Sequence, residues 1–443
     1  MNQPPSSDLH SQEPVGRDQY PDYAADIRPN YSPEASGHAP AGMIRGRDIV
    51  VVGLQPWDIK IGSNCKNIAM ELAKYNRVLY VNAPLDQITF LRHRKEPAVA
   101  RRLAIRKNGE NLVPIGDTMW NLYPRSVIYS INWVRGSGIF NSLNKENNRK
   151  FAADIRKAIR QLGFTDFILF NDSDMLRSFY LSDLLQPALS IYYSRDNLMA
   201  VPYFQRHGRV LEPLLMGKST LVCANSAYLA AVARNYNPHS FDVGQGCDLS
   251  LFDPSGITGV PEDIAVIKGP VIGFIGALLH FRLDLNLLEE LCRRKPEWSW
   301  VFVGKEDEGF EKSALHGLSN VHFLGLKKEE QLPSYLARFD VAMNPQSINA
   351  MTVGNYPRKI DEYLAMGKPT VATATETMEL FRDYVYMGKT ADEYIDLITR
   401  ALQDRDPARA QQRILFARSH TWENSVLAIC KAIREVRPDI DRH

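Results

Sequence analysis

The stretch Asn355-Tyr-Pro-Arg-Lys-Ile-Asp-Glu-Tyr-Leu-Ala-Met-Gly-Lys-Pro-Thr-Val-Ala372 predicts a loop, a short helix, a tight turn and a buried strand. Asn355 and Pro357 both suit a helix start, because Asn can cap free N–H groups and Pro needs no donor there. Gly367 is expected to end the helix, and the segment 370–372 has strand character. The pattern therefore predicts a helix that leads directly into a buried strand.

Lys359 and Glu362 lie one turn apart on this predicted helix, close to its N-terminus. A helix N-terminus favours anions, so a cation here suits a phosphate, and the neighbouring carboxylate suits hydroxyl groups. The alternative is a surface ion pair of little energetic value. The matching flanks favour the binding role.

Length and composition bound the remaining choices. A chain of 443 residues exceeds the size at which one core usually keeps growing, so two domains are expected. The net charge of +2 argues against a dedicated nucleic-acid binder. Five cysteines without a CxxC pair suit a reducing cytoplasm and predict no zinc site. We expect no signal peptide and no membrane span, since no run approaches roughly 18 apolar residues.

The order of apolar and polar segments predicts an α/β protein with two parallel sheets. Residues 1–43 carry seven prolines and no apolar periodicity, and are expected to be a disordered tail. We expect an N-terminal domain over 44–250, a Pro/Gly-rich linker over 251–269 and a second domain over 270–420. The expected strands are 48–53, 77–82, 166–171, 188–193, 220–224, 271–276, 298–304, 321–325, 341–343 and 370–372. Helices are expected at 144–162, 226–234, 283–294, 392–404, 407–418 and 422–436.

The loop after the first strand offers a second candidate site. Gly62, Ser63 and Asn64 open a helix and offer backbone N–H groups to an anion or a sugar oxygen, although a plain N-cap fits equally. Trp57 can stack on a sugar ring, or it can anchor the loop by packing.

Residues 84–124 interrupt the α/β alternation with a basic segment. Seven arginines and lysines between 92 and 107 face a single acid, Glu96, with apolar residues between them. Such a segment suits the headgroup plane of an anionic membrane, and a solvated loop over the sheet is the alternative.

Several phosphate and metal motifs fail. The glycine spacings of a P-loop and of a dinucleotide-binding turn are both missing. Asp172-Ser173-Asp174 follows a strand and can hold a divalent cation, but capping of a following helix is the simpler interpretation.

The motif Pro357-x-Lys359-x-x-Glu362-Tyr-Leu-Ala-x-Gly-Lys-Pro-Thr-Val371 resembles that of retaining glycosyltransferases of the B-type fold. Within that class, the chain is similar to bacterial enzymes of capsule and teichuronic-acid assembly. Ile272-Gly-Phe-Ile-Gly276 and Ser419-His-Thr-Trp422 support the resemblance. It implies two facing Rossmann-like domains, with the segment 421–443 packing back across the first domain.

The resemblance also implies roles for individual residues. Glu362 would accept hydrogen bonds from the ribose hydroxyls of a nucleotide, and the backbone of Gly276 and Ala277 would approach the diphosphate. Lys359 and Arg282 would neutralise the diphosphate in place of a metal ion. Asp196 matches a position where such enzymes often place a polar residue that contacts donor or acceptor, and it is our candidate catalytic residue.

The chain departs from the family at one position. Many retaining members have two glutamates separated by seven residues, and the first of these corresponds to Gly354. The donor-sugar contacts must therefore differ, with backbone around 352–355 as a candidate.

These features predict transfer of a sugar from a nucleoside diphosphate-sugar to a hydroxyl of a glycan or lipid-linked acceptor, in cell-surface polysaccharide synthesis. No cofactor and no metal are expected. The expected location is the cytoplasm or the inner face of the membrane. One alternative is a non-catalytic nucleotide-sugar-binding subunit of an assembly complex. The other is a metal-dependent A-type transferase that uses Asp172 and Asp174.

Overall fold

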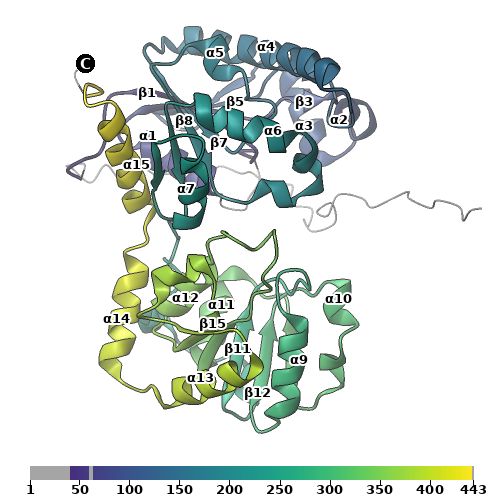
Figure 1. Cartoon of the computed structure of the whole chain (residues 1–443), viewed down its shortest axis with the longest axis vertical. Coiled ribbons are helices and arrows are strands. Elements are labelled where there is room, and N and C mark those ends of the chain that lie inside the picture. The colour runs from purple at the N-terminus through teal and green to yellow at the C-terminus, as the bar shows by residue number, and fades with distance from the viewer. Residues whose placement is uncertain (1–39, 59–62, 442–443) are drawn as a thin grey trace, which may run out of the picture.

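The computed structural model describes residues 40–58 and 63–441, which form two α/β domains stacked along the long axis of the molecule (Figure 1). The expected architecture of two Rossmann-like domains is confirmed. Most of the predicted tail (residues 1–39) and Gly62 lie outside the described residues.

The N-terminal domain is built on a sheet that has eight strands in the described part of the chain, in the order β10-β9-β8-β7-β1-β2-β5-β4. Its strands are parallel except for β4, which runs antiparallel to β5. These strands are β1 (Asp48–Gly53), β2 (Arg77–Val81), β4 (Leu112–Pro114), β5 (Met119–Leu122), β7 (Ile168–Asp172), β8 (Leu189–Ser194), β9 (Leu221–Ala224) and β10 (Ser240–Asp242). A separate short pair joins β3 (Leu85–Asp86) and β6 (Val127–Ile128).

Both faces of this sheet are covered, which explains why its central strand β1 is apolar throughout. Ile49 and Val51 pack toward α1 and α15, whereas Val50 and Val52 pack toward α4. The helices of this domain are α1 (Asn64–Ala73), α2 (Gln87–Arg92), α3 (Pro97–Asn108), α4 (Ser137–Leu162), α5 (Leu181–Leu185), α6 (Pro202–Lys218) and α7 (Ala227–Arg234).

The second domain has a parallel sheet whose six described strands follow the order β13-β12-β11-β14-β15-β16. They are β11 (Val271–Ile275), β12 (Ser299–Val303), β13 (Val321–Gly325), β14 (Val341–Asn344), β15 (Thr370–Thr373) and β16 (Tyr386–Gly388). The helices are α8 (Glu262–Ala265), α9 (Leu285–Arg294), α10 (Glu308–Glu311), α11 (Leu332–Arg338), α12 (Arg358–Ala365), α13 (Ala391–Gln403) and α14 (Pro407–Arg418). Helices α11 and α12 cover one face of the sheet, and α9 and α13 cover the other.

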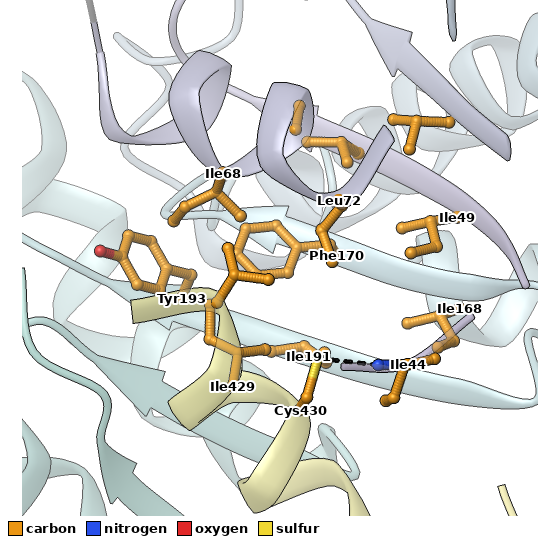
Figure 2. Packing of buried hydrophobic residues seen from close by; sticks show 14 of the residues in the cluster. Ile44, Ile49, Ile68, Leu72, Ile168, Phe170, Ile191, Tyr193, Ile429 and Cys430 are labelled. Atoms are coloured by element: carbon orange, nitrogen blue, oxygen red, sulfur yellow. Dashed lines mark hydrogen bonds between the residues drawn. The ribbon is translucent and has the colours of Figure 1, made fainter. Parts of the chain in front are cut away.

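The last helix, α15 (Trp422–Val436), leaves the second domain and packs beside α1 in the first (Figure 1). Figure 2 shows Ile429 and Cys430 of this helix among core side chains of the sheet, with the Ile44 N–H donating to Cys430 Sγ at 3.5 Å. Met43 joins the same core and is only 3% exposed, so ordered packing begins within the predicted tail.

The structure rules out a solvated loop after β2, which was one of the two interpretations of the basic segment. Residues 87–92 and 97–108 form helices α2 and α3, and β4 and β5 follow them. Pro97 opens α3 at a position that needs no N–H donor, and Gly109 closes it with a φ of +82°. Helix α4 also begins earlier than expected, at Ser137, because the buried side chain of Phe140 anchors its first turn.

Two capping predictions are wrong. No helix begins at Asp172 or Ser173; instead Asp172 accepts a hydrogen bond from Arg195. Asn355 does not cap α12, because its side-chain amide donates to the carbonyl of Met351. Pro357 precedes the first helical residue, and Gly367 ends the turn with a φ of +68°, as its conformational freedom allows.

Candidate functional site

Helix α12 holds Lys359 and Glu362 at the carboxyl end of the second sheet. Ile360, Tyr363 and Leu364 bury one face of the helix, as their spacing predicts. The hydroxyl of Tyr363 accepts a hydrogen bond from the backbone N–H of Ile275 at 3.0 Å. This buried contact fixes the helix against the last residue of β11, so the opposite face is presented beside Gly276.

Gly276 and Lys359 approach each other so closely that only glycine fits. A Cβ atom at Gly276 would lie 1.9 Å from Lys359 Nζ, and the residue has a φ of +141°. The Lys359 ammonium group also lies 5.4 Å from the centre of the Phe274 ring. A Cβ atom at Gly304 would lie 1.8 Å from the Gly276 carbonyl oxygen. The two glycines therefore make room for a cation and a bare backbone at the strand ends.

A cavity of about 220 Å³ opens at this point, where α/β sheets commonly bind ligands. Gly276, Ala277 and Gly304 supply backbone to it, and Ile275, Val303, Leu326 and Leu332 supply apolar surface. Lys305 and Lys327 complete the lining. The cavity thus combines an apolar wall for a flat ring with backbone and cations for an anion.

Lys359 and Glu362 do not form the surface ion pair that was the alternative interpretation. In the described part of the chain, no nitrogen–oxygen contact within 4 Å joins them, and neither side chain has a hydrogen bond. Burial raises the pKa of Glu362, and the Lys359 charge opposes this. Burial likewise lowers the pKa of Lys359, and the Glu362 charge opposes that shift. Both groups are desolvated and, apart from the Phe274 ring beside Lys359, neither has a hydrogen-bond or ion-pair partner among the described residues, as expected of residues that bind a ligand.

Arg282 precedes α9 in the second domain. Its charge acts on Lys359 in its own domain and on Asp196 in the other. The Arg282 carbonyl accepts a hydrogen bond from the N–H of Ser347 at 2.8 Å, which ties the two loops together. Arg282 therefore extends the positive charge of Lys359 toward the space between the domains.

Asp196 follows β8 in the N-terminal domain and belongs to a row of charges. Arg195 Nη1 donates to Asp196 at 2.9 Å, and Arg195 Nε donates to the buried Asp172 at 2.8 Å. Burial raises the pKa of both carboxyl groups, and the Arg195 charge opposes it. The sequence analysis missed Arg195, although parallel strands whose carboxyl ends share one edge could have indicated the pair.

The same contacts weaken the case for an Asp172–Asp174 cation site. Asp174 pairs with Arg177 at 3.0 Å and accepts N–H groups of the following turn. Within residues 40–58 and 63–441, no group of three or more His, Cys, Asp or Glu side chains could hold a metal ion. The two-domain architecture also differs from that of an A-type transferase.

In the first-domain loop, Trp57 and Ser63 make the packing and capping contacts that were one of the two interpretations of each residue. Trp57 is buried and packs edge-on against Tyr80, with ring centres 5.1 Å apart. Ser63 is the N-cap of α1 and accepts the N–H of Lys66. Asn64 exchanges hydrogen bonds with Gln245. Loop packing and helix capping thus account for these contacts, and a role in acceptor binding stays a prediction.

Gly354 is a point of contact between the domains. Its carbonyl accepts a hydrogen bond from Ser226 Oγ at 3.0 Å, and its φ is +81°. A Cβ atom there would lie 2.3 Å from a ring carbon of Tyr228 in α7. Nearby, the Asn197 side chain donates to the Ala350 carbonyl at 2.9 Å. The position of the family's first glutamate is therefore filled by the other domain.

A second cluster that the sequence did not indicate lies beside α12, where the chain passes from the first domain to the second and later returns to the first. Asp361 is completely buried and accepts from Cys247 Sγ at 3.1 Å, and His420 Nδ1 lies 2.6 Å from its other oxygen. Cys247 follows the first domain and His420 precedes α15. Asp361, the residue next to Glu362, thus contacts both segments that connect the domains. No local sequence pattern indicates such long-range contacts.

The chain is similar to known glycosyltransferases in sequence and in fold. Residues 269–404 match the family described as "Glycosyl transferases group 1". The chain is 30% identical over 164 residues to TuaH of Bacillus subtilis (strain 168), whose name assigns it to teichuronic acid biosynthesis as a glycosyltransferase. That match spans 35% of this chain and 41% of TuaH.

Solved structures share the architecture at low identity. The sucrose-phosphate synthase of Thermosynechococcus elongatus is 16% identical with a TM-score of 0.57, over 88% of this chain and 98% of that one. Anabaena HepE, determined in complex with UDP, is 16% identical with a TM-score of 0.53, over 89% and 97%. The chain therefore has the two-domain B-type glycosyltransferase fold, and its residues 269–404 are similar to group 1 glycosyltransferases.

Proposed function

We propose that the protein is a glycosyltransferase that moves a sugar from a nucleoside diphosphate-sugar to a hydroxyl of a glycan or lipid-linked acceptor. The observation that carries this proposal is the pair Lys359 and Glu362, which has no hydrogen-bond or ion-pair partner among the described residues. Lys359 lies beside the bare backbone of Gly276, which lines a cavity. The relationship to TuaH supports a role in cell-surface polysaccharide synthesis.

In this proposal, the donor lies along the carboxyl end of the second sheet. The base occupies the apolar cavity lined by Ile275, Val303, Leu326 and Leu332. Glu362 accepts hydrogen bonds from the ribose hydroxyls, and the backbone of Gly276 and Ala277 approaches the diphosphate. Charge that develops on the leaving diphosphate is stabilised by Lys359 and Arg282, without a metal ion. Because Lys359 and Glu362 are partly removed from water, the interactions of Lys359 with the diphosphate and of Glu362 with the ribose are stronger than in bulk solvent.

The acceptor enters from the first domain. Asp196 is the charged group of that domain on which Arg282 acts, so we assign it a contact with a hydroxyl of donor or acceptor. The contacts Ser226–Gly354 and Asn197–Ala350 hold the two sides together and align the reacting groups. Retention of configuration at the anomeric carbon is part of the proposal, on the strength of the family resemblance. Five free, buried cysteines support a reducing, cytoplasmic setting.

A panel of nucleoside diphosphate-sugars tests the proposal. The purified protein is incubated with UDP-, GDP-, ADP- and dTDP-sugars, each with and without EDTA, and the released nucleoside diphosphate is measured. We expect release from one donor class, undiminished by EDTA. Release that EDTA abolishes would contradict metal independence.

Gly354 favours one alternative, a non-catalytic nucleotide-sugar-binding subunit. The glutamate that related enzymes carry at this position is missing, so the sugar end of the site lacks its usual carboxylate. A non-catalytic subunit would bind one nucleotide-sugar of the panel without releasing nucleoside diphosphate. Binding without release, in the presence of added glycan and lipid-phosphate acceptors, would favour that alternative over the enzyme.

The pH dependence of donor use is expected to report Lys359. Because burial lowers the pKa of its ammonium group, the charge is present below that pKa and is lost as the pH rises through it. We therefore expect kcat/KM to fall on the alkaline side earlier than an ordinary lysine would allow. Lys359→Arg should lower kcat/KM at neutral pH but remove this alkaline limb, since guanidinium stays charged. An alkaline limb that is the same in both proteins would rule out Lys359 as its source.

A further inference from the structure

Helices α2 and α3 form a basic face and contribute almost nothing to the hydrophobic core. Helix α2 buries none of its residues, and α3 buries only Val99. Residues 87–108 nevertheless carry seven arginines and lysines against one acid, Glu96. Among the described residues, only Arg102 of these seven forms an ion pair. The remaining positive charge is therefore available to an external anion.

Large apolar side chains stand exposed beside these charges. Leu91 and Trp133 are each 69% exposed, and Tyr203 is 57% exposed. Hydrogen bonds join the segments that carry them: Ser130 accepts from the Trp133 indole and from the N–H of Ile88, which is itself exposed. Asn132 donates to the carbonyl of Tyr203. The apolar groups thus form part of one surface with α2 rather than scattered exposures.

A cavity of about 530 Å³ lies between the two helices. Phe90, Leu91 and Leu103 give it an apolar lining, and it is also lined by four cations, Arg94, Arg106, Lys107 and Arg125. The Arg106 guanidinium lies 5.5 Å from the centre of the Phe90 ring. An occupant of this cavity needs a negative charge next to hydrocarbon, which is the chemistry of a phospholipid headgroup and its first methylene groups.

We propose that this α2–α3 face, comprising Ile88, Leu91, Arg94, Arg106, Lys107, Arg125, Trp133 and Tyr203, docks on an anionic membrane surface. Trp and Tyr suit the interface between water and hydrocarbon, and the cations attract the headgroups from a distance of a Debye length. A nucleic acid would match the charge but not exposed Leu91 and Ile88. No helix of the described ranges is long and apolar enough to cross a bilayer.

The face is connected to the first-domain loop for which acceptor binding stays a prediction, a step that rests on the proposed function. Arg102 of α3 lies 3.7 Å from Asp58, and both side chains are mostly buried. Asp58 directly follows Trp57, whose N–H donates to Asn82 at the end of β2. In Figure 1, α2 and α3 lie at the end of the N-terminal domain opposite α15. Docking through this end would bring membrane-borne acceptors close to Trp57 and Asp58, in the described part of that loop.

Co-sedimentation with vesicles tests the docking without any nucleotide, so its failure would leave the proposed sugar transfer untouched. Wild-type protein is mixed with vesicles of phosphatidylcholine alone, or with 30% phosphatidylglycerol. We expect binding only to the anionic vesicles and release by salt. Each lysine or arginine near such a surface is worth about fivefold, so Arg94→Glu, Arg106→Glu and Lys107→Glu together should weaken binding at least about 100-fold.

Two further variants keep the test specific. The triple control Lys157→Glu, Arg160→Glu and Lys431→Glu makes the same charge change at exposed sites on α4 and α15 and should lose much less affinity. The double variant Leu91→Ser and Trp133→Ser keeps the net charge and should also weaken binding. The substituted side chains lie on the surface, both on the α2–α3 face and at the control sites, so the unfolding midpoints of these variants should not change. Equal binding to neutral vesicles, equal losses in both triple variants, or no binding by the wild type would overturn the proposal.

Discussion

Glu362→Ala is expected to lower kcat/KM for the nucleotide-sugar about 10²- to 10³-fold while the protein stays folded. The Glu362 carboxylate would accept two hydrogen bonds from the ribose hydroxyls. Removing this charged acceptor costs about 3–4 kcal/mol of binding energy for the two bonds together. Stability should not fall, because Glu362 has no hydrogen bond to the described protein and burial already disfavours its charge. The measurement is nucleoside diphosphate release at subsaturating donor, beside thermal unfolding.

Glu376→Ala supplies the matched control, since this acid is exposed and belongs to the same domain. It should leave kcat/KM unchanged. Glu362→Gln should fall between the two, because the amide oxygen still accepts a hydrogen bond but carries no charge. Unchanged kinetics in Glu362→Ala would remove the residue from the donor site, and an equal loss of stability would make its role structural.

Gly354→Glu is expected to damage the protein, although it restores the glutamate that related enzymes carry. The backbone φ of +81° disfavours a side chain, and the new Cβ would meet the Tyr228 ring at 2.3 Å. The left-handed conformation costs about 1–2 kcal/mol and overpacking about 1–3 kcal/mol. We therefore expect a loss of about 2–5 kcal/mol in the free energy of unfolding in urea, and lower donor turnover because the clash displaces the Gly354 carbonyl from Ser226.

Two further variants separate the causes of that loss. Gly317→Glu adds the same side chain to the same domain, but its Cβ meets nothing within 4 Å, so it should be nearly neutral. Adding Tyr228→Ala to Gly354→Glu relieves the clash but not the backbone strain, and should restore activity only in part. Higher turnover in Gly354→Glu alone would show that the cleft accommodates the family's usual carboxylate, against the geometry described above.

The second domain could be predicted closely from the sequence because its signals are local. The strand Val321–Gly325 follows directly from an apolar run, and the turn after α12 follows from Gly367, which adopts the left-handed region. The approach of Lys359 to Gly276 could not be predicted from spacing, since it depends on how α12 packs on β11. Only the resemblance to a family brought those two residues into one site.

The failures have a common physical origin in long-range contacts. Asp172 appeared to be a helix cap, but Arg195, which follows the neighbouring strand β8, donates a hydrogen bond to its carboxylate. Gly354 looked like a missing catalytic group, whereas Tyr228 from the other domain occupies that space. Helices α2 and α3 have almost no buried side chains, so their apolar periodicity was too weak to distinguish them from a loop.

A crystal structure with a bound nucleoside diphosphate tests the central claim most directly. The account predicts the ribose within hydrogen-bonding distance of Glu362, the base in the cavity beside Leu326 and Leu332, and the diphosphate against Gly276 and Lys359. A nucleotide bound instead at the Asp172–Arg195–Asp196 edge of the first domain, with Glu362 left free, would contradict it.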